Sequence, residues 1–274
     1  MEDSELNIIF RTYYSKNPNF KREEVKQMLK KTGLLVTLLL CLSVMQAADA
    51  KINVGLDLGY QMIGMGDINE FVDFMASMIS AGSGQTATVS KLSNATAMGI
   101  KGSYDLNEKI SLGLKVGTLS TNKAKVEVMA MEALSASASL MPILIGGAYK
   151  FMSKDKISLS GELYLGTVSS EEKFTFMTGP STTAEMQTSG SGTSIDIGVA
   201  GEYSVAKNIT LGASLGYKMC TISELKVKAD VDMNGDGNTD VVAGEVVKKM
   251  SDPSQNMKAD FTGVNLQLSV NYKF

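Results

Sequence analysis

The chain contains no histidine and no tryptophan, and it has only four prolines and two cysteines among 274 residues. Histidine is the side chain whose ordinary pKa best suits proton transfer near neutral pH, so its absence removes the usual general base of hydrolases. The sequence also has no Walker-type phosphate loop and no Cys-x-x-Cys pair. Because no nucleophile and base can be paired, the sequence predicts a non-catalytic protein with no catalytic residues.

Long apolar runs are also missing, except for one near the N-terminus. Lys30 and Lys31 precede the run 33–44, and Ala48-Asp49-Ala50 follows it. A basic start, about a dozen apolar residues and an A-x-A end are the parts of a secretory signal peptide, and the run is shorter than the roughly 20 residues of a membrane-spanning helix. We therefore expect a signal peptide over 28–50, with cleavage after Ala50 and a mature domain over 51–274.

The segment before this signal, residues 1–27, is polar and has no export feature of its own. We interpret it as a mis-assigned start, and the alternative is a long N-terminal part of the signal that is removed with the rest. Cys41 lies inside the apolar run, where the preceding Leu40 does not fit a lipoprotein site. Cys220 is then the single cysteine of the mature domain, so an internal disulfide is excluded. No basic stretch follows the signal, which excludes nucleic acid as a partner.

What the mature sequence does contain is alternation of apolar and polar residues. Residues 52–62 alternate along their whole length, as a strand with one apolar and one polar face does. The pattern recurs in seven further segments of about 9–11 residues or slightly fewer, the length with which a tilted strand crosses a bilayer. They are 98–106, 110–116, 143–151, 157–165, 195–205, 209–219 and 264–274.

An internal repeat predicts how these strands are connected. An aromatic-ended strand, a short polar turn and an Ile-Ser/Thr-Leu restart occur at 104–112, 149–159 and 203–211, and the chain ends at the fourth equivalent place. We expect these four places at one edge of a barrel, with an aromatic girdle there. The predicted girdle consists of Tyr104, Tyr149, Phe151, Tyr203, Tyr272 and Phe274.

The chain end carries the most specific family resemblance. The alternating stretch Val264–Phe274 stops on an aromatic residue, with Tyr272 two positions earlier. It resembles the C-terminal assembly signal of bacterial outer-membrane proteins, and the topology is similar to that of small OmpA/OmpX-type barrels. The resemblance implies an all-β, eight-stranded, antiparallel up-and-down transmembrane barrel in the outer membrane of a Gram-negative-type bacterium. It also implies contact with outer-membrane lipid, recognition of Phe274 by the barrel assembly machinery, and a monomer. Ten strands are the alternative, if the first long loop hides a hairpin.

The alternation predicts which charged residues face the barrel interior. They are Asp57, Lys101, Lys115, Glu162, Asp196, Glu202 and Lys218. An eight-stranded barrel is only just wide enough for its own side chains. We therefore expect a lumen filled by ion pairs, with a narrow polar conduit as the alternative.

The first long loop has helical rather than strand periodicity. Asp67 and Glu70 have the spacing of a capping box, and Gly82 is a possible end. Apolar residues follow at helical spacing, namely Ile68, Phe71, Val72, Met75, Met78 and Ile79. The sequence predicts one short amphipathic helix in the first extracellular loop. It either covers the barrel mouth and buries its own apolar face or presents that face to a partner or lipid.

The last long loop contains the pattern Asp-x-Asn-x-Asp-Gly-x-x-Asp over 232–240. Oxygen ligands at alternate positions, with glycine at a sharp turn, suit calcium. The pattern resembles the calcium loops of integrin-type propeller repeats, and the predicted ligands are Asp232, Asn234, Asp236, Asn238 and Asp240. The alternative is an acidic hairpin turn, because Asn-Gly and Asp-Gly both favour turns.

Two functions remain open at this stage. The first is a non-catalytic surface protein that supports membrane integrity or adhesion through its projecting loops. The second is a narrow channel or small-ligand carrier. Outer-membrane barrel enzymes typically use a histidine, which this chain lacks, and the fold alone does not choose between the two functions.

Overall fold

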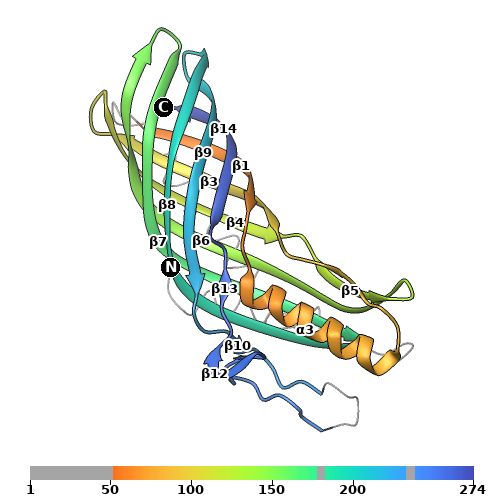
Figure 1. The fold of residues 1–274 in the computed structure, drawn as a ribbon. Coiled ribbons are helices and arrows are strands. Elements are labelled where there is room, and N and C mark those ends of the chain that lie inside the picture. The colour runs from red at the N-terminus through yellow and green to blue at the C-terminus, as the bar shows by residue number, and fades with distance from the viewer. Residues whose placement is uncertain (1–51, 178–182, 233–237) are drawn as a thin grey trace, which may run out of the picture. The chain divides into compact units, whose positions relative to one another are not determined.

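A computed structural model describes residues 52–177, 183–232 and 238–274. The expected N-terminal extension and signal peptide, 1–50, lie outside the described residues. The described chain forms one large antiparallel sheet in which eight long strands close into a ring (Figure 1). These strands are β1 (Ile52–Met62), β3 (Asn94–Asp105), β4 (Ile110–Thr121), β6 (Met131–Lys154), β7 (Ile157–Met177), β8 (Thr183–Ala206), β9 (Ile209–Ile222) and β14 (Gly263–Lys273).

The strands follow one another around the ring in up-and-down order. β1 pairs with both β3 and β14, and the pairing of β8 with β9 closes the ring. Starting from Ile143 on β6 and stepping from strand to strand through paired residues, one direction around the ring reaches Leu211 and the other reaches Thr221. These two residues lie ten positions apart on β9. Such a stagger is the shear that a closed barrel of tilted strands requires. The predicted eight-stranded barrel is confirmed.

Side chains alternate between the outside and the lumen along each strand. On β14, Leu266, Leu268 and Val270 are 52–62% exposed, and they share the outer face with apolar residues of the neighbouring strands. The odd-numbered residues of the same strand, such as Asn265 and Gln267, line the interior. Apolar side chains are outside and polar ones inside, the opposite of a water-soluble protein. This distribution suits a wall that faces lipid.

The three short turns and the C-terminus lie at one end of the ring (Figure 1). The last residue is tied to the first strand, because the Phe274 amide donates to the Ile52 carbonyl at 2.9 Å. The six predicted girdle residues all lie at this end and are 36–55% exposed. Tyr272 and Phe274 also contact each other edge to face, with centroids 4.8 Å apart.

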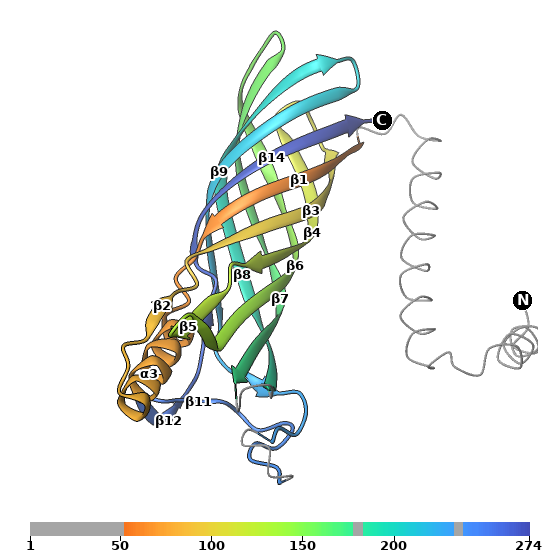
Figure 2. The ribbon, with the colours of Figure 1, turned by 90° about the vertical axis from the view of Figure 1, so that its right-hand side faces the viewer.

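At the opposite end, three strands continue well beyond the ring and are covered by the long loops (Figure 2). We call this part the head. It comprises the outer ends of β6, β7 and β8 together with smaller elements. These are α3 (Gly66–Ser83), β2 (Thr88–Ser90), β5 (Ala124–Val128), β10 (Lys226–Val227), β11 (Lys248–Lys249), β12 (Asp252–Asn256) and β13 (Ala259–Asp260). None of the described helices is both long and apolar enough to span a membrane.

Within the head the inward face of the strands is apolar and the outward face is polar, the opposite of the barrel. On β7, the apolar Leu163 and Leu165 point outward, whereas further along the same strand Phe174 and Phe176 point inward and are buried. The inward residues of β6, β8 and the loops join them in one apolar core. The head is therefore a separately packed unit with the ordinary polarity of a water-soluble protein.

The predicted helix exists, but its ends differ from the prediction. It begins after Met65, which is in the left-handed region at φ 49° and supplies no side-chain cap, so the capping box at Asp67 and Glu70 is wrong. It ends at Gly84 rather than Gly82, because Gly84 adopts φ 66° and its amide donates to the Ser80 carbonyl at 3.0 Å. Met78, expected on the buried face, is 58% exposed.

Candidate functional site

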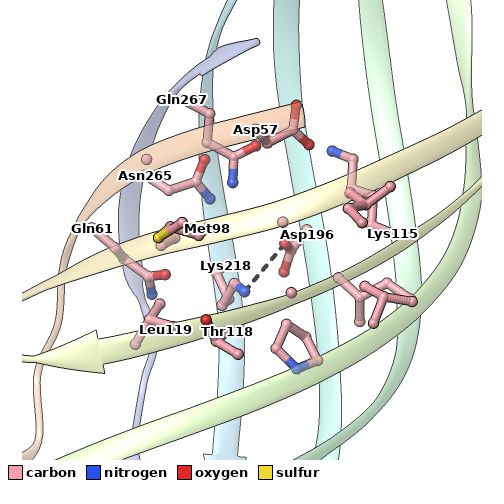
Figure 3. A pocket seen from close by; sticks show the side chains of 18 of the residues that line it. Asp57, Gln61, Met98, Lys115, Thr118, Leu119, Asp196, Lys218, Asn265 and Gln267 are labelled. Carbon is pink, nitrogen blue, oxygen red and sulfur yellow. Dashed lines mark ion pairs between the residues drawn. The ribbon is translucent and has the colours of Figure 1, made fainter. Parts of the chain in front are cut away.

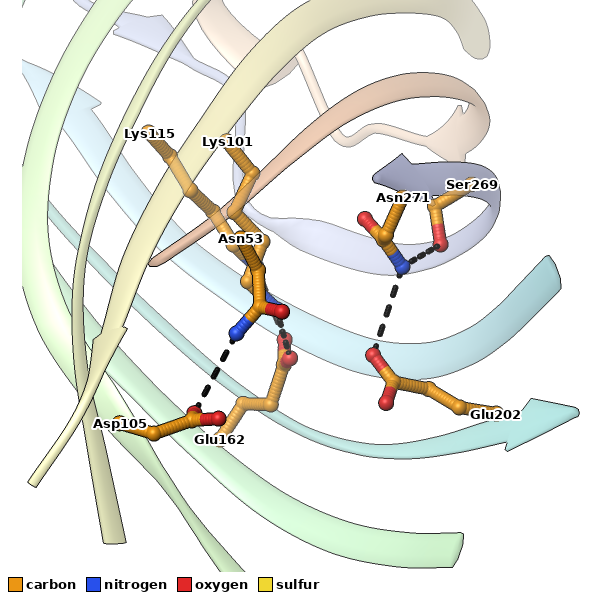
Figure 4. Close-up of polar contacts among 8 residues, drawn as sticks. All are labelled: Asn53, Lys101, Asp105, Lys115, Glu162, Glu202, Ser269 and Asn271. Carbon is orange, nitrogen blue, oxygen red and sulfur yellow. Dashed lines mark hydrogen bonds and ion pairs between the residues drawn. The ribbon is translucent and has the colours of Figure 1, made fainter. Parts of the chain in front are cut away.

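The lumen near the short-turn end contains one carboxylate held by two lysines (Figure 4). Glu162 accepts from Lys101 at 2.5 Å and from Lys115 at 2.9 Å. Lys101 and Lys115 are directly opposite each other on β3 and β4. Two like charges in that position repel, so Glu162 on β7 compensates them across the lumen.

A second ion pair lies further toward the head (Figure 3). Lys218 on β9 and Asp196 on β8 are direct cross-strand neighbours with their charged atoms 3.4 Å apart. The Ser194 hydroxyl also donates to Asp196 at 3.0 Å. Both charged side chains are at most 12% exposed. The prediction that inward charges form ion pairs is confirmed for five of the seven residues named from the sequence.

The other two predicted residues also lie inside. Asp57 lines the cavity beside Lys115 (Figure 3). Glu202 accepts from the Asn271 amide at 3.4 Å (Figure 4). Asn271 was not predicted, although its position in the alternation of β14 points it inward.

Tyr164 is the largest side chain of the lumen that sequence reasoning missed. Its ring lies 4.1 Å from the Lys115 ammonium, measured to the centroid, and 1% of its surface is exposed. A Cβ at Gly113 would be 2.8 Å from the Tyr164 hydroxyl, so a glycine there makes room for the ring. The alternation of the sequence could have identified it, because Tyr164 lies on the inward face of β7 between Glu162 and Gly166.

These side chains leave little free volume. The cavity among Asp57, Lys115, Asp196, Lys218 and Gln267 measures about 50 Å³, which is room for only a few water molecules. A larger hollow of about 270 Å³ opens at the short-turn end and is lined by charged and hydroxyl residues. These two hollows can hold waters and ions, and both are smaller than the roughly 300–1,000 Å³ of typical organic-ligand pockets.

Apolar and polar contacts together fix the helix in the head. The Phe71 ring meets Phe174 at 5.3 Å and Phe176 at 6.3 Å, both edge to face. On its polar side, Asp67 and Glu70 accept from Lys249 at 3.2 and 2.9 Å. The helix therefore buries its own apolar face against the extended strands, and both acidic residues of the expected capping box instead hold the last loop.

One carboxylate of the head is buried without a lysine partner among the described residues. Glu172 lies inside the head, 1% exposed, and accepts from the Thr188 hydroxyl at 2.7 Å. It lies seven residues past Leu165, the last outward apolar residue of β7 before the head. Burial raises its pKa, and the hydrogen bonds from its neighbours offset this only in part.

This gives the head an unusual pH dependence. Because the folded-state pKa of Glu172 is raised, the free energy of unfolding falls as pH rises from the ordinary glutamate range, about 4.3, to the raised value. Below that window the carboxyl is neutral in both states and costs nothing. We expect Glu172→Gln to stabilise the head at pH 7 and to have little effect below pH ~4. Protease resistance of the head across this range, compared between the two proteins, measures it. An equal difference at both pH values would contradict the assignment.

The predicted calcium ligands are only partly described. Asp232, Asn238 and Asp240 lie on the arms of a hairpin, whereas Asn234 and Asp236 lie outside the described residues. The arms are held together by Val231, whose amide donates to the Val241 carbonyl at 2.9 Å. Across the three described ranges, acidic and cysteine side chains form no group of three that could hold a metal. The calcium site stays a prediction.

The comparison with protein families decides where the chain belongs. It matches the outer membrane protein beta-barrel domain over residues 33–274. The chain is a member of this family. The short-turn end is then periplasmic, the head is extracellular, and the apolar outer wall of the ring faces the lipid of the outer membrane.

Solved structures resemble it in fold alone. Ail, the attachment invasion locus protein of Yersinia pestis, is 12% identical, with 83% of this chain and 100% of that chain covered and a TM-score of 0.43. A major outer membrane protein of Thermus thermophilus is 12% identical, with 81% and 99% covered and a TM-score of 0.49. The outer membrane protease OmpT of Escherichia coli is 10% identical, with 82% and 97% covered and a TM-score of 0.41. A search of curated proteins finds no match.

Proposed function

We propose that this barrel is a non-catalytic surface protein whose extracellular head supports membrane integrity or adhesion. One observation carries the proposal: the extracellular loops pack into a head with its own apolar core, above a lumen closed by ion pairs. A channel needs an open path through the lumen, whereas a surface for partners needs a packed frame. The ordered head supplies such a frame, and the 50 Å³ cavity below it does not supply a path.

Two measurements test this function. In planar bilayers the purified protein should give no sustained single-channel current. Cells carrying a variant in which residues 170–190 are replaced by a short turn should lose surface attachment or detergent resistance, because that hairpin forms one wall of the head. The barrel part should still migrate as a folded, heat-modifiable species. Sustained conductance of the unmodified protein would instead favour the narrow channel, for which the 270 Å³ periplasmic hollow is the supporting feature.

We propose calcium as a structural ion of the 232–240 hairpin and Phe274 as the contact with the assembly machinery of a monomeric barrel. Without a cation the acidic residues at the hairpin tip repel one another. We expect millimolar calcium to protect residues 232–242 from protease, with an affinity near the 10⁻⁴–10⁻³ M typical of extracellular sites. Asp240→Asn should abolish that protection, and Asp252→Asn, in another part of the same loop, should not. Calorimetry without calcium binding up to about 10 mM, well above that range, would leave an acidic turn.

A further inference from the structure

The paired residues of the wall mark where its apolar band ends. One row across four neighbouring strands is apolar and exposed, and the next row out contains three threonines. The first row is Ile145, Leu165, Ile195 and Met219, and the second is Ile143, Thr167, Thr193 and Thr221. On β7, β8 and β9 the change occurs at the same register. The strand pairing is therefore continuous from the lipid-facing wall into the outer face of the head.

Beyond the last apolar row, the outer face of β7 and β8 consists mainly of hydroxyl side chains. We call Thr167, Ser169, Ser189, Ser191 and Thr193 the hydroxyl face. Each is exposed or half-exposed. They are cross-strand neighbours, with Thr167 opposite Thr193 and Ser169 opposite Ser191. The side chains of these four make no hydrogen bond to any other described residue, so their hydroxyls are available to a ligand.

The height of the hydroxyl face fixes which layer it meets. Two residues of a strand rise about 6.8 Å along its axis, and a tilt of about 40° reduces that to roughly 5 Å of height per row. The headgroup layer extends about 5–8 Å beyond the hydrocarbon on each side. The first row, Thr167 and Thr193, therefore lies at headgroup level, and the second row, Ser169 and Ser191, lies roughly 5 Å further out.

The charges on this surface are paired within the protein. Glu171 forms an ion pair with Lys228 at 2.9 Å, and Lys173 forms one with Glu185. Recognition of lipid phosphates normally uses lysines or arginines that are free to reach them. Neutral hydroxyls that both donate and accept suit another hydroxyl-rich ligand. We propose that the hydroxyl face binds the saccharide headgroups of glycolipids in the outer leaflet, and so anchors the head to that leaflet.

This inference concerns lipid contact and does not depend on which partner the head serves. The test compares the unmodified protein with Thr167→Val/Ser169→Ala/Thr193→Val, which removes three hydroxyls with little change of shape. The matched control is Thr86→Val/Thr88→Val/Ser90→Ala, the same exchanges at exposed sites of the first loop. Each protein is placed in phosphatidylethanolamine vesicles with or without purified lipopolysaccharide. Glycolipid molecules retained per protein are counted by native mass spectrometry.

We expect the wall variant to retain at least threefold less lipopolysaccharide than the unmodified protein, and the control to retain as much. Equal retention by the wall variant, or equal loss in the control, would overturn the proposal. A third set of vesicles contains phosphatidic acid, whose headgroup is a phosphate with neither a sugar nor a free alcohol. A similar difference there would mean that phosphate is recognised, and would also refute a saccharide site. If the wall variant does not fold, a photoreactive residue at Ser191, compared with one at Thr88, should still crosslink to the glycolipid.

Discussion

Replacement of Leu268 by arginine should destabilise the barrel by about 2–4 kcal/mol, the cost of a cation on the lipid side at mid-bilayer depth. Leu268 is 62% exposed in the absence of lipid, near the middle of β14, and its paired neighbours are Leu58 and Ala213. All three point toward the hydrocarbon. An arginine there has neither water nor a carboxylate within reach. Urea unfolding in phospholipid vesicles, followed by gel migration, gives the free energy.

The control is the neighbouring residue on the other face. Gln267 lines the polar cavity that also contains Asp57 and Asp196. Gln267→Arg places the same cation near carboxylates, so its cost should be clearly smaller. The comparison isolates orientation, since the two substitutions are adjacent in sequence and at the same depth. Equal costs would show that the register is wrong, because a slip of one residue exchanges the two faces along the whole strand.

Removal of Glu162 should have an effect of similar size for a different reason. Glu162→Ala leaves Lys101 and Lys115 facing each other, each only 16% exposed and without their shared carboxylate. Breaking a buried ion pair from one side typically costs about 3–5 kcal/mol, because an uncompensated charge remains. We expect urea unfolding to show this decrease in the free energy of unfolding. If water replaces the missing side chain, the current in planar bilayers should also be higher.

A surface ion pair provides the comparison for that variant. Glu171 pairs with Lys228 on the outside of the head, where the Glu171 side chain is 66% exposed. Glu171→Ala should therefore cost only about 0–1 kcal/mol. If both alanine variants lost the same small amount, the lumen would be well hydrated, and the ion pairs would not close it.

The sequence by itself determined the barrel and its faces. Eleven alternating residues at the C-terminus can satisfy their backbone in lipid only within a closed sheet, and a period of two leaves one choice of which face is inside. The same alternation places Glu162, Lys101 and Lys218 in the lumen. It also located the girdle, since the turn repeat recurs with an aromatic residue at each copy.

Only the tertiary structure decided which of these residues meet. Glu162 pairs with Lys101 and Lys115 rather than with Lys218. The stagger of the strands determines which side chains face each other across the lumen, and the alternation of apolar and polar residues does not contain that information. The same holds for the helix. Its apolar face was readable, but Asp67 and Glu70 hold Lys249 instead of capping it, since a lysine nearly two hundred residues away is brought beside them by folding. Local patterns fix the direction in which a side chain points, and long-range packing fixes what it touches.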